Sequence, residues 1–384
     1  MKKLVSHLLI PLGIFTLLSL PSSCKKEEIL GKTKFVFGAD LSYVNQILEH
    51  GGVYRDNGQI KDPYQIFKDH GANLVRLRIW HNPVWTKDVY GSNGTKMYND
   101  LADIKVAIRR CKDAGLAVNL DFHFSDTWAG PGKQNIPAAW ASAGLEVLID
   151  SVYQYTYQTL KALNDEGLMP EMVQIGNEIN PGMLLPLGSC YSANGWKNQG
   201  RLINSGIKAV RDVSALSTIK TQIILHIAQP ENVEFWFNKI SAEGAVTDFE
   251  IIGFSYYSKW SDVPITEISK YVADFKGVFN KEVMIVETAY PWTSQNADSY
   301  NNIYNAGDVE PGYPLSEEGQ LNFMTDLTKA IMDGGGMGIM VWEPAWISSS
   351  AKDLWGTGSS WENCTFFDFG WNANRGMGFM LHKY

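Results

Sequence analysis

The chain has 384 residues, 45% of them hydrophobic, which is enough for one large domain or two ordinary ones. Its 33 Lys and Arg are outnumbered by 41 Asp and Glu, giving a formal net charge of −8. Because the basic residues are also scattered, this balance argues against a polyanionic partner, and we expect no nucleic-acid binding. The 13 Trp and 17 Tyr offer flat faces that suit sugar rings, although a single aromatic residue fills a core equally often.

Residues 1–23 have the pattern of a secretory signal peptide. Two lysines precede an apolar stretch, and the small residues of "LPSSC" follow it. Cys24 resembles the lipid-acceptor cysteine of bacterial lipoproteins, although Pro21 stands where an aliphatic residue is usual. A cleaved signal with an incidental cysteine is the alternative. We expect an exported lipoprotein of the outer membrane, held at the cell surface by a lipid on Cys24, with residues 24–34 as a tether.

Beyond the tether, apolar runs alternate with segments of helical period. Eight runs read as strands because they are short, apolar or β-branched, and bounded by turn residues. They span residues 35–40, 74–80, 117–123, 172–178, 222–228, 251–257, 283–289 and 338–344. Helical spacing marks segments between them, among them 103–115, 265–279 and 318–335.

Glycines mark the ends of several predicted helices. Gly71, Gly115 and Gly334 each end a predicted helix just before the next strand, where glycine is favoured. No shorter repeat and no linker divides the chain. Eight strand–helix units in one chain of this size predict a single (β/α)8 barrel spanning residues 35–384.

Three cysteines remain besides Cys24. Cys111 lies at helical spacing in an apolar pattern, so we expect it to be a small core residue. Cys190 and Cys364 lie in predicted loops, where they could form a disulfide or stay free.

Polar side chains stand at the carboxyl ends of the predicted strands, which is where a barrel enzyme places its reactive groups. Glu178 follows "VQIGN" at the end of the fourth run, and Glu287 follows "VMIV" in the seventh. Other strand ends carry charged or aromatic residues, namely Asp40, Arg76, Arg78, Asp121, His123, Trp342 and Glu343. Alternation along a strand points Arg76 with Arg78, and Asp121 with His123, into the barrel. Such charges serve either a structural ion-pair network or a substrate.

A pair of glutamates across one cleft suits glycoside hydrolysis. A retaining enzyme uses one carboxylate as nucleophile and the other as acid and then base. Arg76 near Glu287 would keep that residue ionised, whereas nearby negative charge would raise the pKa of Glu178. Asn177, beside Glu178, would hydrogen-bond the sugar 2-hydroxyl.

Several motifs in one order resemble glycoside hydrolase family 53, the arabinogalactan endo-β-1,4-galactanases. They are "GADLSYV", "LVRLRIWHNP", "DFHFSDTWAGPGKQ", "VQIGNEINPGMLLP", "IAQPENVEFWF", "GFSYYSKW", "VETAYPW" and "MVWEPAW", between about residues 37 and 369. Asn-Glu alone is shared by many barrel glycosidases, but "DFHFSDTW" together with "WEPAW" is specific. The resemblance implies a retaining endo-galactanase whose (β/α)8 catalytic domain cleaves β-1,4 linkages in galactan and arabinogalactan, and we expect a monomer.

Carried over by position, the resemblance implies that Glu178 is the acid/base and Glu287 the nucleophile. It implies substrate contacts for Arg76, Asp121, His123, Asp126, Trp128, Asn177 and Trp342, with Arg76 supporting the nucleophile and Trp342 under the sugar at the cleavage point. Leu185 and Gly130 depart from the family pattern, in which Trp and Asp are usual at these places. Both departures concern outlying sugar subsites rather than the catalytic pair.

The resemblance also implies a structural calcium ion between the loops that follow the last two strands. The corresponding positions are Asn296, Asp298, Tyr300, Asn302, Ser359 and Glu362. Calcium takes six to eight oxygen ligands, but a phenol is a poor one, so Tyr300 would have to offer its carbonyl or be replaced by water. The alternative is a polar loop whose Asn and Asp make turns. We expect no organic cofactor.

Two other functions compete with a galactanase. A related barrel enzyme that cuts β-1,4-glucan or mannan would share the catalytic pair and differ in its sugar pocket. A glycan-binding lipoprotein on an inactive barrel would keep the aromatic residues and lose the chemistry. The presence of Glu178, Glu287, Asn177 and Arg76 together argues against the second.

Overall fold

The computed structural model of the chain describes Met1 and residues 35–384. The tether expected at 24–34, its Cys24, and all of the expected signal peptide except Met1 lie outside the described residues. Within the described part of the chain, no helix combines the length and the apolar character needed to cross a membrane.

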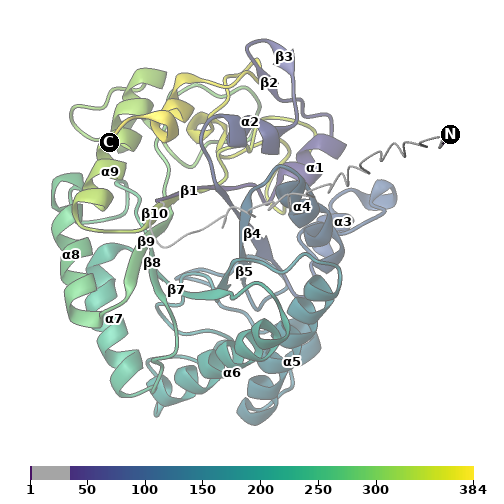
Figure 1. Ribbon diagram of the computed structural model, residues 1–384, viewed down its shortest axis with the longest axis vertical. Coiled ribbons are helices and arrows are strands. Elements are labelled where there is room, and N and C mark those ends of the chain that lie inside the picture. Colours follow the sequence, from purple (N-terminus) through teal and green to yellow (C-terminus); the bar gives the residue numbers. More distant parts are fainter. Residues whose placement is uncertain (2–34) are drawn as a thin grey trace.

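Eight parallel strands close into a barrel, as predicted (Figure 1). Each strand pairs with the next along the chain, and the last pairs with the first. The strands are β1 (Val36–Asp40), β4 (Leu74–Ile79), β5 (Ala117–Phe122), β6 (Met172–Ile175), β7 (Gln222–Ala228), β8 (Ile251–Ser255), β9 (Glu282–Glu287) and β10 (Gly338–Val341). The prediction of a (β/α)8 barrel is confirmed.

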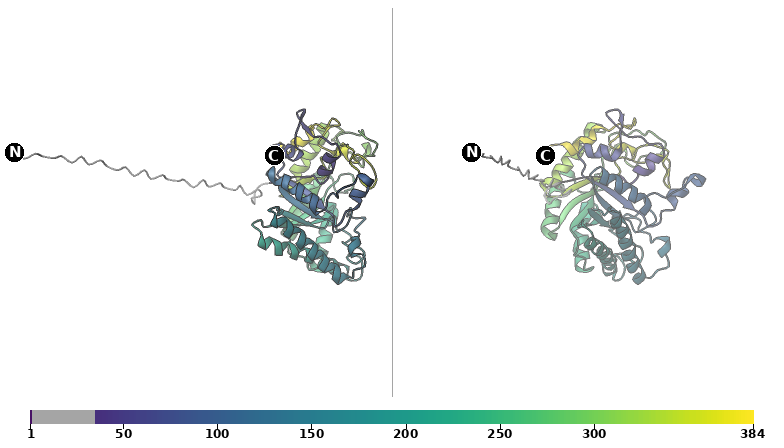
Figure 2. Two further views of the ribbon diagram at one scale, coloured as in Figure 1. Left: turned by 90° about the vertical axis from the view of Figure 1, so that its right-hand side faces the viewer. Right: turned by 45° about the vertical axis from the view of Figure 1, so that its right-hand side comes forward.

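Helices form a layer outside the strands, visible from the side in Figure 2. They are α1 (Val44–Glu49), α2 (Pro63–Asp69), α3 (Trp85–Asp88), α4 (Leu101–Asp113), α5 (Leu145–Asp165), α6 (Gly195–Leu216), α7 (Pro230–Ala242), α8 (Ile268–Phe279) and α9 (Glu317–Asp333). Short 3-10 helices are η1 (Gly91–Asn93), η2 (Ala138–Trp140), η3 (Ile265–Glu267), η4 (Ala306–Asp308), η5 (Glu362–Cys364) and η6 (Arg375–Leu381). A small hairpin, β2 (Arg55–Asp56) with β3 (Gln59–Ile60), follows α1.

Several helices begin at side chains that satisfy free backbone N–H groups. The carboxylate of Asp62 accepts from Tyr64 N at 2.9 Å and starts α2, and that of Asp100 accepts from Asp103 N at 2.9 Å and starts α4. Ser316 caps α9 in the same way. Such caps are worth about 1 kcal/mol each and fix where the helices start.

Inward-facing residues change from apolar to polar along the strands. Near the strand starts, Leu74, Ala117, Met172, Ile224 and Ile251 are fully buried and pack together. Two residues further along, and so on the same inward face, stand Arg76, Asn119, Gln174, His226 and Gly253. The barrel is therefore sealed by side chains at its base and carries its polar groups at the carboxyl ends of the strands.

Six strands end earlier than the sequence predicted, and β6 and β10 show the largest difference, three residues each. β6 ends at Ile175 rather than at residue 178, because Gly176 has φ +85° and Glu178 itself has φ +46°. β10 ends at Val341, and Glu343 has φ +45°. These left-handed conformations turn the chain out of the sheet. The prediction that Glu178 ends its strand is therefore wrong by three residues, whereas Glu287 does end β9.

The structure also tests the predictions for the glycines that end helices and for the cysteines. Gly71 and Gly115 have φ +102° and +69° after their helices, but after α9 the left-handed residue is Gly335, with φ +77°, instead of Gly334. Cys111 is fully buried in the core, as predicted, and Cys190 and Cys364 are buried free thiols that do not pair.

Candidate active site

Arg76 lies at the centre of the polar end of the barrel. It is buried, and its guanidinium contacts groups from four different strand ends. Nη1 lies 2.8 Å from Asp40 Oδ2, and Nη2 lies 2.7 Å from Asp121 Oδ2 and 2.8 Å from Glu287 Oε1. Nη2 also donates to Asn177 Oδ1 at 2.7 Å. Three carboxylates and one amide are thereby held around a single cation.

Glu287 carries two distinct contacts on its carboxylate. Oε1 faces Arg76, and Oε2 accepts a hydrogen bond from the Tyr257 hydroxyl at 3.1 Å. The residue is 6% exposed, so one cation and one hydroxyl replace most of its hydration. Two fixed donors orient this carboxylate, as a nucleophile requires.

Within residues 35–384, no Lys, Arg or His side chain forms an ion pair with Glu178. Its Oε1 accepts a hydrogen bond from the Ser255 hydroxyl at 2.7 Å, and the side chain is only partly buried. The Cβ that any other residue would place at Gly130 would lie 3.3 Å from Glu178 Oε2. The missing side chain at Gly130 therefore leaves space beside Oε2, and the expectation that the Gly130 departure concerns outlying subsites rather than the catalytic pair is wrong.

The two glutamates titrate as an interacting pair. Burial raises the pKa of Glu178 above its usual range, and it raises that of Glu287 to about 8. The Arg76 guanidinium opposes this rise at Glu287, whereas the charge of Glu178 adds to it. Arg76 therefore favours the ionised form of Glu287, as expected, but it offsets only part of the rise that desolvation causes. One proton held by the pair belongs on Glu178, since only Glu287 touches the cation.

Asn177 is held on both ends of its amide. Oδ1 accepts from Arg76, and Nδ2 donates to the Ala129 carbonyl at 2.8 Å. The Gln134 amide also donates to the Asn177 carbonyl at 2.8 Å. These contacts fix the residue next to the catalytic candidate Glu178.

Asp121 and His123 lie below the open part of the site. Asp121 is fully buried, and its Oδ2 contacts both Arg76 and His123 Nε2, the latter at 3.0 Å. His123 Nδ1 accepts from Trp80 Nε1 at 3.3 Å and from Ala129 N at 3.1 Å. Both ring nitrogens of His123 are thus occupied by protein groups. In this structure the two residues belong to the ion-pair network, and Asp121 Oδ1 is a buried oxygen with no protein partner.

Two partly exposed tryptophans lie close together at this end of the barrel. Trp128 and Trp342 have ring centroids 5.8 Å apart, and Trp342 packs edge-on against Trp361 at 4.8 Å. The guanidinium of Arg78 lies 4.2 Å from the Trp128 ring. Flat aromatic surfaces of this kind match the apolar face of a sugar ring.

Asp126, also predicted to contact substrate, holds two loops by hydrogen bonds to their backbones. Its Oδ1 accepts from Asn82 N at 3.0 Å and its Oδ2 from Ala138 N at 2.7 Å. The carboxylate therefore joins two loops at the rim.

Arg78 pairs with Glu343 Oε1 at 2.5 Å, and both side chains are buried.

Four polar residues of this site were missed in the sequence. They are Gln174, His226, Ser255 and Tyr257, which interrupt or end apolar runs on β6, β7 and β8. Their signal was present: His226 stands within "QIILHIA", and Ser255 and Tyr257 share one face of "GFSYY". An uncharged residue in a strand is ordinary, however, so nothing in the pattern marked them as functional.

The loops after β9 and β10 bring together some of the predicted calcium ligands. Asp298 Oδ2 accepts from the Ser348 hydroxyl at 2.6 Å, and the same hydroxyl lies in very short contact with Glu362 Oε2. Burial raises the pKa of Glu362, and the charge of Asp298 raises it further. Two carboxylates converge here on one small group, which is an arrangement that a cation stabilises.

The other predicted calcium ligands make separate contacts with different protein groups. Asn296 Oδ1 accepts from Asn302 Nδ2 at 2.6 Å, and Asn302 Oδ1 is buried without a protein partner. The Tyr300 hydroxyl points to Asp353, at 2.7 and 2.9 Å from its two oxygens, and the Ser359 hydroxyl donates to a backbone carbonyl. In the residues that the structure describes, no cluster of three or more His, Cys, Asp or Glu is placed to share a metal.

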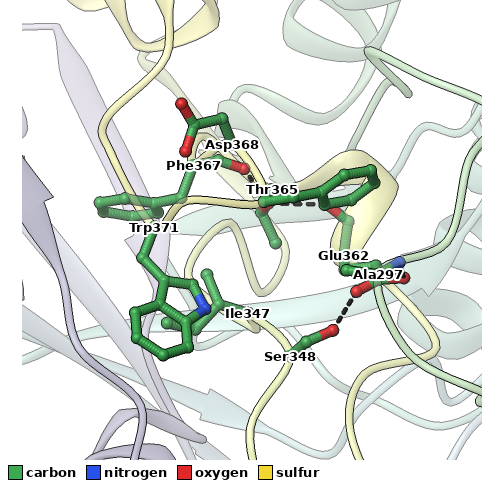
Figure 3. A pocket seen from close by; sticks show the side chains of 9 residues that line it. Ala297, Ile347, Ser348, Glu362, Thr365, Phe367, Asp368 and Trp371 are labelled. Atoms are coloured by element: carbon green, nitrogen blue, oxygen red, sulfur yellow. Dashed lines mark hydrogen bonds between the residues drawn. The ribbon is translucent and has the colours of Figure 1, made fainter.

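A cavity of about 10 Å³ lies beside Ser348 and Glu362 (Figure 3). It is lined by Ala297, Ile347, Ser348, Glu362, Thr365, Phe367, Asp368, Phe369 and Trp371. A space of this size holds about one water molecule and excludes a sugar. Of the predicted calcium ligands, Glu362 lines this cavity, and Asp298 reaches the region through its contact with Ser348.

Comparisons with known proteins agree with this geometry. Residues 36–380 match the sequence profile of glycosyl hydrolase family 53. The arabinogalactan endo-β-1,4-galactanase of Cellvibrio japonicus is 44% identical over 342 residues, covering 88% of each chain. The endo-β-1,4-galactanase of Bacillus subtilis is 34% identical, covering 88% of this chain and 78% of that protein. The solved Ignisphaera aggregans family 53 catalytic domain superposes with a TM-score of 0.81 at 33% identity, covering 90% and 95%. This chain therefore belongs to glycosyl hydrolase family 53.

Proposed function

We propose that the protein is an endo-acting, retaining β-1,4-galactanase that cleaves galactan and arabinogalactan. The observation that carries the proposal is the contrast between the surroundings of the two glutamates in one site. Glu287 is paired with Arg76 at 2.8 Å, and Glu178 meets only the neutral Ser255 hydroxyl at 2.7 Å. One is thus set to be ionised and the other to hold a proton, which is the division that double displacement needs. We infer the substrate, galactan or arabinogalactan, from the names of the family relatives.

In the first half of the reaction, Glu287 attacks the anomeric carbon while the glycosidic bond breaks. The leaving oxygen takes the bond electrons together with the proton of Glu178. In the second half, Glu178 removes a proton from water, and that water displaces Glu287 from the sugar. Asn177, fixed by Arg76, is placed to meet the 2-hydroxyl of the reacting sugar. Trp342 lies under the sugar at the cleavage point, and Trp128 lines the cleft.

Release of reducing ends tests this proposal. Purified protein is incubated with potato-type β-1,4-galactan, and with β-1,4-glucan and β-1,4-mannan as controls. A galactanase releases reducing ends from the first polymer, and an endo mode gives oligosaccharides with an early fall in viscosity. Preferential cleavage of glucan or mannan would assign the sugar pocket to another substrate. Binding to galactan without any cleavage would identify an inactive glycan-binding barrel.

We further propose that Cys24 carries a lipid that anchors the protein in the outer membrane, at the cell surface. The support is the sequence of residues 1–24, with its charged, apolar and small-residue regions. A polymer such as galactan cannot readily cross a membrane before it is cut, so display outside the cell places the enzyme beside its substrate.

A calcium ion bound by Asp298 and Glu362 is also proposed. The two carboxylates share one hydroxyl, and Asn302 Oδ1 is a buried oxygen without a protein partner. The loop from Trp292 to the start of α9 is long, with only the short η4 within it. A cation would join this loop to the one after β10 and order both at the rim of the cleft.

A further inference from the structure

A chain of hydrogen bonds joins Glu178 to the interior of the barrel. The Ser255 hydroxyl lies 2.7 Å from Glu178 Oε1 and 2.8 Å from His226 Nε2. The three residues come from the ends of neighbouring strands: Glu178 follows β6, His226 lies on β7, and Ser255 ends β8. Ser255 and His226 are fully buried, so no solvent competes for these contacts.

The neighbours of His226 decide which way these hydrogen bonds run. The backbone N–H of Glu178 points at His226 Nδ1 at 3.3 Å, and a backbone N–H can only donate. Gln174 Nε2 lies 2.8 Å from the same Nδ1. The amide of Gln174 cannot be reversed without loss, because its Oε1 already faces donors on Arg76 and Asn119, each at 3.4 Å. Two donors therefore meet Nδ1, which makes it the acceptor.

One contact favours the opposite tautomer. Asn177 Oδ1 lies 3.0 Å from His226 Nδ1, and a protonated Nδ1 could donate to it. That oxygen already accepts a charge-assisted hydrogen bond from Arg76 at 2.7 Å, so it has a stronger donor. With Nδ1 as acceptor, the single ring proton of neutral His226 is on Nε2 and is donated to Ser255. Ser255 then directs its own proton to Glu178 Oε1.

Because Oε1 receives this hydrogen bond, the proton that Glu178 transfers belongs on the other oxygen. Oε2 lies on the side of Gly130, where a Cβ would come within 3.3 Å. Glycine leaves this oxygen uncovered for the leaving oxygen of the substrate. The arrangement thus assigns different tasks to the two oxygens of one carboxyl group.

We propose that Ser255, oriented by His226, is a positioning residue that confines the transferable proton of Glu178 to Oε2. The proposal rests on the proposed function, in which Glu178 is the acid/base. In the first step, Oε2 gives its proton to the leaving oxygen as the glycosidic bond breaks, and Glu178 becomes a carboxylate. In the second step, Oε2 takes a proton from the attacking water. The Ser255 proton stays on Ser255 throughout.

The charges around the chain agree with this direction. Burial and the charge of Arg76 hold the pKa of His226 well below its usual range, so the ring is neutral. Burial raises the pKa of Glu178, and the hydrogen bond from Ser255 lowers it. The other titratable groups that act in this region are Arg76 on β4, Asp121 on β5, His123 after β5, Glu287 on β9 and Tyr257 after β8. Loss of Ser255 leaves all of these in place and removes the hydrogen bond that lowers the pKa of Glu178, together with the acceptor of the His226 proton.

The test compares Ser255→Ala with wild type on two substrates. One is galactan, whose leaving sugar needs a proton, and the other is a dinitrophenyl β-galactobioside, whose leaving group does not. We expect kcat/KM on galactan to fall about 10- to 100-fold, as for loss of a hydrogen bond to a charged group, and kcat/KM on the activated substrate to change far less. The basic limb of the galactan pH profile should move to higher pH, because the Ser255 hydrogen bond lowers the pKa of Glu178. Ser255→Thr, which keeps a hydroxyl, should restore much of the activity.

Two further measurements separate this role from a structural one. Ser205→Ala removes a serine hydroxyl that bonds the Ile149 carbonyl between α5 and α6, and it should leave both substrates and the pH profile as in wild type. In the wild-type protein, ¹⁵N NMR of the His226 ring, assigned with His226→Gln, should show the Nε2–H tautomer. An Nδ1–H tautomer, an unmoved basic limb or equal losses on both substrates would overturn the proposal. A wild type that cleaves the activated substrate but no galactan would instead remove the proposed function first.

Discussion

Replacing Arg76 by Met should separate the stabilising role of its ion pairs from its effect on the nucleophile. Met has a similar length but no charge, so Asp40, Asp121 and Glu287 would lose their common cation. Removing one partner of a buried ion pair costs about 3–5 kcal/mol. Three carboxylates lose their cation here, but each can take up a proton and become neutral. The loss of folding free energy therefore stays near that of one broken pair instead of reaching three times that value. Against a typical stability of about 5–15 kcal/mol, the variant should still fold.

The same change should alter the pH dependence of catalysis. Glu287 attacks only when ionised, and burial already raises its pKa to about 8 while Arg76 opposes the rise. Without Arg76 the pKa rises further, so activity is lost at low pH and returns only at higher pH. The acidic limb of kcat/KM, which reports ionisation in the free enzyme, should therefore move upward in pH.

Arg78→Met is the matched control. Arg78 stands two residues away on the same strand, is equally buried, and pairs with Glu343 rather than with Glu287. Urea unfolding should show a loss of about 3–5 kcal/mol for both variants. Only Arg76→Met should shift the acidic limb. Equal limb positions in the two variants, or an unshifted limb in Arg76→Met, would refute the assignment of Arg76 as the support of the nucleophile.

Three further outcomes follow from the proposed roles and locations. Glu287→Ala should abolish galactan hydrolysis and, with azide and an activated galactoside, yield the α-azide, whereas Glu178→Ala should yield the β-azide; wild-type rates in either variant would contradict the roles. Cys24→Ser should move the protein from the membrane fraction to the soluble fraction with unchanged specific activity, and fractionation like wild type would exclude the lipid anchor. Chelator should lower the melting temperature and calcium should restore it, because binding to the folded state alone stabilises it. Asp298→Asn should lose much of that response, and an unchanged melting curve with no metal in elemental analysis would exclude the ion.

The barrel could be predicted because its strands are buried on both faces. Runs such as "LVRLRIW" and "QIILHIA" are apolar for most of their length, and glycines separate them from the preceding helices. Strand ends were less certain, since a non-glycine residue with positive φ leaves no composition signal. Glu178, with φ +46°, and Glu343, with φ +45°, are examples, whereas Gly176 just after β6 was a signal that the prediction did not use.

The charged residues of the site could be predicted from the sequence, whereas its neutral residues could not. Arg76, Glu178 and Glu287 attract attention because charges inside a barrel need partners. Ser255 and His226 matter only through contacts between neighbouring strands, and these depend on register. Ser348 was missed for the same reason: its hydroxyl lies between Asp298 and Glu362, which are 64 residues apart in the chain by their numbers.

The position of the nucleophile is tied to closure of the barrel. Arg76 binds Asp40 at the end of β1, Asp121 on β5 and Glu287 at the end of β9, so one guanidinium connects strands on different sides of the ring. β1 and β9 are not neighbours, because β10 lies between them. In the closed barrel the carboxylate of Glu287 loses most of its water and gains Arg76 as a partner, so the same contacts that join the strands also complete the catalytic group.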